Sequence, residues 1–150
     1  MSQEKGSFGQ SKQRSGREII SVQGLSVGYN GADILEDVSF GVQKGEIFAI
    51  LGTSGCGKTT LFNALIGLLS PSKGRIEVGG ESLGPQSDER SLARVRRQIG
   101  VLFQSGALLD WLTVGENVAF RIRETTDLPE DIIAQIVRLK LELVKLENNV

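Results

Sequence analysis

The spacing of hydrophobic and polar residues predicts two strands near the start of the chain. Residues 18–27 are rich in β-branched and apolar side chains and lead into Gly-Tyr-Asn-Gly at 28–31, a sequence typical of a turn. Residues 34–42 follow, and there Val38 and Phe40 alternate with polar neighbours. Two such stretches joined by a short turn predict a pair of antiparallel strands.

Residues 46–51 show a different pattern. They form a short, nearly continuous apolar run bounded by Gly45 and Gly52, which is typical of a strand buried on both faces in a parallel sheet. From residue 58 to residue 69, apolar side chains recur at helical spacing, and Ser70-Pro71 ends the pattern. A helix that directly follows a buried strand indicates an α/β domain.

The middle of the chain predicts shorter elements. We expect a strand over 75–78, a turn at Gly79-Gly80 and a polar loop through Pro85. Residues 99–103 are a second candidate for a buried strand, and Gln104 ends it. Between them we expect a helix over 91–98. A group of arginines on and beside this helix forms either a solvated charged face or a phosphate-binding cluster: Arg90, Arg94, Arg96 and Arg97.

Two helices are expected in the last third of the chain. The first begins near Thr113, because a threonine followed three positions later by Glu116 has the form of a capping box. The second begins between Asp127 and Glu130, with Pro129 in its first turn. Its apolar stripe consists of Ile132, Ile133, Ile136, Val137, Leu141 and Val144.

Composition narrows the possible chemistry. The chain has 150 residues, a length that suits one domain, and it contains no histidine and a single cysteine, Cys56. An internal disulfide framework, a histidine-ligated metal and a Ser-His-Asp triad are therefore excluded. With 17 basic and 18 acidic residues, the charge balance gives no case for nucleic acid as a partner.

The N-terminal residues 1–17 are mostly Ser, Gln, Gly, Lys and Arg, and we expect them to form a disordered tail. The alternative is a docking arm anchored by Phe8. No apolar stretch approaches the ~20 residues that span a bilayer, and no hydrophobic segment follows the N-terminal charges. We therefore expect the chain to lie in the cytosol.

The strongest chemical signal is a phosphate-binding pattern over 52–59. The sequence Gly-Thr-Ser-Gly-Cys-Gly-Lys-Thr matches G-x-x-x-x-G-K-[ST] at every fixed position, between an expected strand and an expected helix. Backbone N–H groups and the helix N-terminus can converge there on a phosphate, and the glycines allow close approach. The residues expected to contact the nucleotide are Gly52, Thr53, Ser54, Gly55, Cys56, Gly57, Lys58, Thr59 and Thr60.

Each polar residue of this loop has an expected role. Lys58 reaches the β- and γ-phosphate oxygens, the Thr59 hydroxyl ligates Mg²⁺, and Thr60 meets the α-phosphate through its hydroxyl or N–H. Cys56 is either a small residue at a permissive position or a redox-sensitive thiol at a helix N-terminus. A Gly-rich turn without a ligand is the alternative for the whole loop.

Three flanking segments narrow the class of nucleotide-binding protein. They are Leu-Ser-Pro-Ser-Lys-Gly-Arg-Ile at 69–76, Arg-Arg-Gln-Ile-Gly-Val-Leu-Phe-Gln at 96–104 and Leu-Thr-Val-Gly-Glu-Asn-Val at 112–118. With the phosphate loop and the upstream Tyr29, they closely resemble the ATP-binding subunit of an ABC transporter. The resemblance runs from about Ile19 to the end. It implies that residues 18–150 are the N-terminal part of an ATP-binding domain with an α/β P-loop fold. An antiparallel β portion near the N-terminus and a helical subdomain beginning about residue 105 are expected within it.

The resemblance also implies roles for two further residues. Tyr29 matches the aromatic residue that stacks on adenine, although it could instead be an ordinary core or turn tyrosine. Gln104 matches the Q-loop glutamine, which touches Mg²⁺ and the attacking water, and it could instead simply end a strand. ATP and Mg²⁺ are the implied cofactors.

The implied partners are a transmembrane permease subunit and a second ATP-binding subunit in a head-to-tail dimer. Residues 105–118 match the surface that meets the permease, where Leu108, Leu109 and Trp111 form either an apolar docking patch or part of the subdomain core. The permease would hold the chain at the inner face of the cell membrane. Residues 103–114 and Leu128-Pro129-Glu130 look most like the ATPases of Mla- and Mce-type lipid transporters.

Several motifs of the family are missing from the sequence. It has no Leu-Ser-Gly-Gly signature, no strand ending in Asp-Glu and no switch histidine. We expect a chain cut before these elements, which binds ATP without turnover; a natural short ATP-binding protein is the alternative. Two other functions remain open: a regulatory module that docks on the permease, and a P-loop phosphotransferase that uses Arg90 to Arg97 as a lid.

Overall fold

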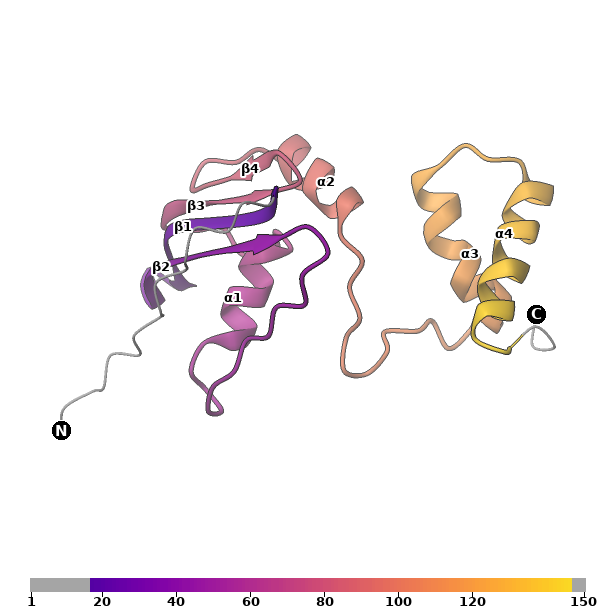
Figure 1. Ribbon diagram of the computed structural model, residues 1–150, viewed down its shortest axis with the longest axis horizontal. Coiled ribbons are helices and arrows are strands. Elements are labelled where there is room, and N and C mark those ends of the chain that lie inside the picture. The colour runs from indigo at the N-terminus through magenta and orange to yellow at the C-terminus, as the bar shows by residue number, and fades with distance from the viewer. Residues whose placement is uncertain (1–16, 147–150) are drawn as a thin grey trace. The chain divides into compact units, whose positions relative to one another are not determined.

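The computed structural model describes residues 17–146, and these residues form two compact units (Figure 1). The first unit ends at Gly100 and the second begins at Val101. The expected disordered tail over 1–17 lies, apart from Arg17, outside the described residues. The expected start of a helical subdomain near residue 105 stays a prediction.

The first unit is built on a four-stranded antiparallel sheet with the order β2-β1-β3-β4. Strand β1 (Glu18–Tyr29) pairs with β2 (Ala32–Gln43), which confirms the expected pair of antiparallel strands. Asn30 and Gly31 form the turn between them with positive φ angles of 54° and 79°. The short strand expected over 75–78 is β3 (Lys73–Val78).

Strand β4 (Glu81–Leu83) was not expected, because this segment reads as a polar loop. It pairs with β3 across the turn at Gly79-Gly80, and its one large apolar residue, Leu83, is fully buried. Three residues are too few to show the alternation that identifies a strand. Pairing with β3 therefore decides its conformation.

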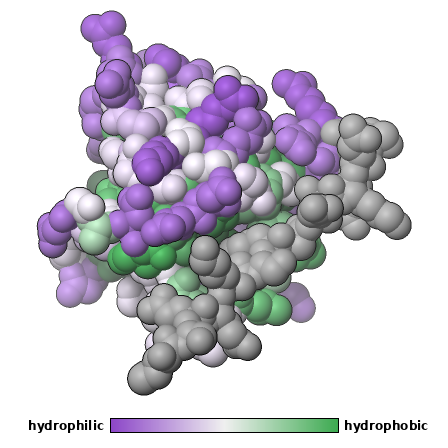
Figure 2. Space-filling view, turned by 90° about the vertical axis from the view of Figure 1, so that its left-hand side faces the viewer, coloured by the Kyte–Doolittle hydropathy of each residue, from purple (hydrophilic) through white to green (hydrophobic). Residues whose placement is uncertain are grey.

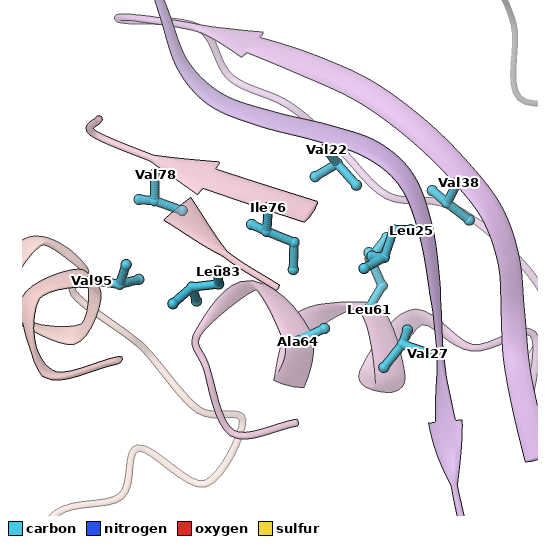
Figure 3. Close-up of a cluster of buried hydrophobic side chains, with 10 residues drawn as sticks. All are labelled: Val22, Leu25, Val27, Val38, Leu61, Ala64, Ile76, Val78, Leu83 and Val95. Carbon is cyan, nitrogen blue, oxygen red and sulfur yellow. The ribbon is translucent and has the colours of Figure 1, made fainter. Parts of the chain in front are cut away.

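The core of the first unit lies between the sheet and two helices, α1 (Lys58–Leu65) and α2 (Glu89–Gln98). Figure 3 shows side chains from all four strands and both helices converging on one apolar interior. Its members are Val22, Leu25, Val27, Val38, Leu61, Ala64, Ile76, Val78, Leu83 and Val95. Seen from the side, hydrophilic residues gather at the top of the view and hydrophobic ones form a band beneath them (Figure 2).

Both helices differ in length from the expected ranges. Helix α1 ends at Leu65 rather than at Leu69, because the backbone turns at Gly67, where φ is 72°. Helix α2 begins two residues earlier than expected, because the Asp88 side chain accepts a hydrogen bond from the Ser91 N–H at 2.9 Å and caps it.

The arginines of α2 are largely engaged in structural contacts. Arg94 pairs with Glu81 at 2.8 Å, and Arg96 pairs with Glu89 at 2.8 Å. A second Arg96 nitrogen donates to the Gly67 carbonyl at 2.7 Å, which ties α2 to the turn after α1. These contacts favour the solvated charged face over the phosphate-binding cluster.

The two segments expected to be buried strands, 46–51 and 99–103, form no strand in this structure, so both expectations are wrong. Ile47 and Leu51 are 98% and 89% exposed, and Leu102 is 86% exposed. Phe48 stacks on the Phe40 ring, with the ring centroids 5.0 Å apart, and Ile50 and Ile99 pack against the core of the first unit. An apolar run shows that a segment favours burial, but a strand also needs a neighbour with which its backbone can pair. Among residues 17–146, no strand pairs with either segment.

The second unit is a pair of helices, α3 (Val114–Thr125) and α4 (Glu130–Leu143). Both were expected, and Thr113 and Glu116 form the predicted capping box. Ala119 packs with three buried residues of the α4 stripe, Ile133, Val137 and Leu141. No helix within 17–146 is long and apolar enough to cross a membrane.

The capping box makes the stability of α3 depend on pH. The pKa of Glu116 lies below its usual range, because its carboxylate accepts hydrogen bonds from the backbone N–H of Thr113 first and from its side chain second. A group with a lowered pKa stabilises the fold above the usual carboxyl range, and this contribution is lost as the pH falls through the folded-state value.

We therefore expect the urea midpoint, followed by circular dichroism at helical wavelengths, to fall between pH 7 and pH 3, and to fall less in Glu116→Gln. The matched control is Glu124→Gln, which changes an exposed glutamate of the same helix outside the capping box. An equal loss of acid dependence in both variants would contradict the prediction.

Candidate functional site

The loop between 52 and 57 reverses the chain before α1 and depends on left-handed backbone conformations. Gly55 and Gly57 have φ angles of 81° and 95°. Side chains rarely adopt such angles, so these two positions need glycine. Gly57 is also the N-cap residue of α1, and no side chain caps that helix end. The first-turn N–H groups of α1 are therefore donors without a side-chain acceptor, an arrangement that suits an anion.

Lys58 folds back over this loop. Its Nζ donates to the carbonyls of Gly52 at 2.8 Å and Thr53 at 2.7 Å, and it lies 3.7 Å from the Cys56 Sγ. An ammonium group has three donors, and sulfur is a weak acceptor. The charge is thus held at the mouth of the loop, with its third donor available to a stronger acceptor.

Close contacts fix the two end glycines of the loop. A Cβ added at Gly57 would lie 2.7 Å from Leu35 Cδ2, and a Cβ added at Gly52 would lie 2.4 Å from Cys56 Sγ. Strand β2, which carries Leu35, therefore backs the loop directly. Cys56 is an exposed free thiol that fills the space beside Gly52. This agrees with the first of its two expected roles, that of a small residue at a permissive position.

The two threonines that follow Lys58 differ in exposure. Thr59 is exposed, as a hydroxyl that ligates Mg²⁺ must be, whereas Thr60 is only 6% exposed and packs into the first unit. Of the two expected contacts from Thr60, this burial favours the backbone N–H over the hydroxyl.

Tyr29 ends β1 and is 44% exposed, so it is not an ordinary core residue. Its hydroxyl accepts a hydrogen bond from the Asn63 Nδ2 at 3.3 Å, which connects it to the same helix that begins at the loop. Asn63 was not among the residues predicted from the sequence. Its position four residues after Thr59 on the expected helix could have done so, because residues i and i+4 share a helix face.

Gln104 belongs to the second unit, whereas the loop belongs to the first. It is exposed and opens a turn in which the Gly106 N–H donates to the Phe103 carbonyl at 2.9 Å. Its expected contact with Mg²⁺ and water stays a prediction.

The segment before α3 presents apolar side chains at the surface of the second unit. Leu108 and Trp111 are each 75% exposed, and Leu109 is half-buried. A cavity of about 320 Å³ lies beside them. Its lining consists of Leu108, Leu109, Asp110, Leu112, Val114, Asn117 and Val118.

Asn117 holds this segment in place, which explains the asparagine in the sequence Leu-Thr-Val-Gly-Glu-Asn-Val. Its Nδ2 lies within 3.1 Å of three carbonyls, those of Leu109, Leu112 and Thr113. Its Oδ1 accepts from the Leu109 N–H at 2.8 Å. A side chain that satisfies both the donor and the acceptor of one loop residue fixes the shape of that loop.

Comparison with known proteins places this geometry in context. Residues 35–150 match the family model described as ABC transporter. The intermembrane phospholipid transport system ATP-binding protein MlaF of Haemophilus influenzae is 44% identical over 130 residues, which are 87% of this chain and 49% of that protein. The probable ribonucleotide transport ATP-binding protein mkl of Mycobacterium leprae is 39% identical over 127 residues, 85% of this chain and 36% of its own length.

A solved structure shows the same fold. The structure of cbiO1 from Clostridium perfringens, described as part of the ABC transporter complex cbiONQ, superposes with a TM-score of 0.74 at 32% identity. The match covers 88% of this chain and 52% of that one. The chain thus spans about half the length of MlaF and of cbiO1.

Proposed function

This chain belongs to the ABC transporter family, and we propose that it binds Mg-ATP at the 52–60 loop as the ATP-binding part of a transporter ATPase. One observation carries the proposal: Lys58 is held at the mouth of a loop whose left-handed glycines lead into the uncapped N-terminus of α1. Backbone N–H donors, a helix dipole and a fixed cation together suit a chain of phosphates.

Different residues of the first unit would bind different parts of the nucleotide. The loop N–H groups and Lys58 hold the phosphates, and Tyr29 presents its ring face to the adenine. The exposed Thr59 hydroxyl would hold Mg²⁺, because it is an oxygen donor of the kind that Mg²⁺ prefers. When bound, Mg²⁺ neutralises negative charge on the β- and γ-phosphate oxygens.

We propose that the chain on its own binds ATP without turnover. The sequence contains neither the Leu-Ser-Gly-Gly signature nor the histidine that hydrolysis requires by resemblance to the family. Isothermal titration of the chain with Mg-ATP tests binding, and phosphate release tests turnover. Saturable binding without phosphate release is the expected result. Phosphate release that disappears in Lys58→Ala would refute the proposed absence of turnover.

We propose phospholipid or a related lipid as the substrate of the transporter. The support is the 44% identity to an ATP-binding protein of an intermembrane phospholipid transport system. The relative named for ribonucleotide transport is less similar, at 39%. Transport of a labelled phospholipid between membranes, in cells that lack this chain and in cells that carry it, tests the substrate.

The partner proposed for the second unit is the transmembrane subunit of that transporter, which would hold the chain at the inner face of the cell membrane. The docking surface is the segment 108–114, where Leu108 and Trp111 are exposed and Asn117 fixes the backbone. The same surface would serve a chain that regulates transport without hydrolysis. An exposed tryptophan beside a cavity is the kind of residue that dominates binding energy at an interface.

Trp111→Ala is expected to weaken capture of the chain by the purified membrane subunit by about tenfold or more. Trp111 is the only tryptophan, so its emission should also shift to the blue when the wild-type chain docks. The control is Leu139→Ala, which truncates an exposed apolar residue of α4 outside the docking surface. Equal capture of both variants would remove the 108–114 segment as the docking surface.

A further inference from the structure

The hydrogen bond between Asn63 and Tyr29 joins residues 34 positions apart in the sequence. Tyr29 is the last residue of β1, beside the turn at Asn30-Gly31, and nearly half of its surface is exposed. A partly exposed ring can change between its staggered rotamers unless its far end is held. Among the described residues, the Asn63 amide is the group that donates to its hydroxyl.

Asn63 is itself held firmly. It is half-buried in α1, and its carbonyl accepts two hydrogen bonds, from the Leu68 N–H at 2.8 Å and the Leu69 N–H at 3.2 Å. These bonds close the C-terminal turn of the helix around Asn63. The donor that reaches Tyr29 therefore projects from a fixed backbone.

The position of Asn63 along α1 relates the ring to the phosphate loop. Asn63 stands four residues after Thr59 and so lies on the same helix face, about 6 Å further along the axis. The N-terminus of this helix forms one part of the candidate nucleotide site, and the hydroxyl of Tyr29 is anchored one turn later. One rigid element thus sets the position of the ring with respect to the loop.

We propose that Asn63 is a positioning residue for adenine: its amide holds the Tyr29 ring in the orientation that stacks on the base. This role rests on the proposed binding of ATP. Asn63 does not touch the nucleotide; it lowers the entropy that the Tyr29 ring would otherwise lose on stacking. The base contact should therefore depend on Asn63, and the phosphate contacts should not.

The test compares ATP with inorganic tripolyphosphate, each with Mg²⁺, on the full chain. Asn63→Leu keeps the side-chain volume and suits a helix but removes the donor. It should weaken ATP binding about fivefold, the effect of one lost hydrogen bond, and leave tripolyphosphate binding unchanged. Tyr29→Phe should have the same effect, and the double variant should be no weaker than either single one. The control is Gln135→Leu, which replaces an exposed amide on α4.

A spectroscopic readout separates positioning from a general structural effect. Tyr29 is the only tyrosine, so ring-labelled chain gives a single set of tyrosine NMR signals. ATP, but not tripolyphosphate, should shift these signals through the ring current of adenine, and Asn63→Leu should reduce the shift at saturating ATP.

Each outcome has one meaning. Equal weakening of both ligands, or no weakening of ATP, would overturn the role of Asn63 while leaving the phosphate loop intact. Wild-type binding of tripolyphosphate as tight as that of ATP would overturn the base contact of Tyr29 and with it the role of Asn63. Binding of neither ligand by the wild-type chain would overturn the proposed function, and the positioning role would fall with it.

Discussion

Replacing Lys58 with alanine is expected to weaken Mg-ATP binding at least tenfold. Hydrogen bonds to charged groups contribute about 1.5–3 kcal/mol each, so the loss of one such bond, from the third Nζ donor to a phosphate oxygen, weakens binding by a factor of about 10 to 150. The substitution also removes the bonds from Nζ to the carbonyls of Gly52 and Thr53. The loop then loses its internal cross-link as well as its cation. Isothermal titration with Mg-ATP measures the effect.

Lys44→Ala is the matched control, because Lys44 is an exposed lysine in the turn after β2 and its replacement changes the net charge by the same amount. The affinity of this variant for Mg-ATP should stay within twofold of the wild type. If Lys58→Ala also stayed within a few-fold, the phosphates would have to bind elsewhere, and the proposed site would be wrong.

Gly74→Ala is expected to destabilise the first unit by about 2–5 kcal/mol. Gly74 has a φ of 75°, and a Cβ there would lie 2.3 Å from the Gly24 carbonyl oxygen and 2.5 Å from that of Gln23. The left-handed conformation costs a side chain about 1–2 kcal/mol, and the overlap adds about 1–3 kcal/mol. Both neighbours are backbone atoms of the central strand β1, which cannot move aside without breaking the sheet. The register between β1 and β3 is already irregular at this point.

Gly31→Ala separates the two contributions. Gly31 has nearly the same φ, 79°, but nothing lies within 4 Å of an added Cβ. It should therefore show only the conformational cost, about 1–2 kcal/mol. Urea unfolding followed by circular dichroism gives both values. Equal destabilisation of the two variants would show that the close approach of β3 to Gly24 adds nothing to the free-energy cost of Gly74→Ala.

The sequence predicted the elements whose signals are local. A capping box needs only Thr113 and Glu116, and a hairpin turn needs only Asn30 and Gly31, so both were located correctly. The strands predicted over 46–51 and 99–103 did not form, because a strand depends on a second segment for its hydrogen bonds. Both segments are apolar, but the exposure of Ile47 shows that apolar composition alone does not provide a strand with which to pair.

The candidate site followed the same division. The loop at 52–60 was predicted because its chemistry is written into consecutive residues, and the left-handed angles of Gly55 and Gly57 agree with the role expected of them. Asn63 was missed because its importance depends on contact with Tyr29, far away in the sequence. Asn117 lay inside a recognised motif, but only the structure shows that its amide holds the loop at 109–113.

The segment 46–51, in which Ile47, Phe48 and Leu51 are exposed, also bears on how the chain behaves at high concentration. It joins Ile47, Phe48, Ile50 and Leu51 in a stretch without proline and with one charge, which is the composition of segments that form cross-β aggregates. Because this stretch lies next to the phosphate loop, intermolecular β-pairing would remove the nucleotide site along with the soluble protein. Lys44, two residues before the segment, and Glu46, its first residue, place charge where such pairing would begin and act as its gatekeepers.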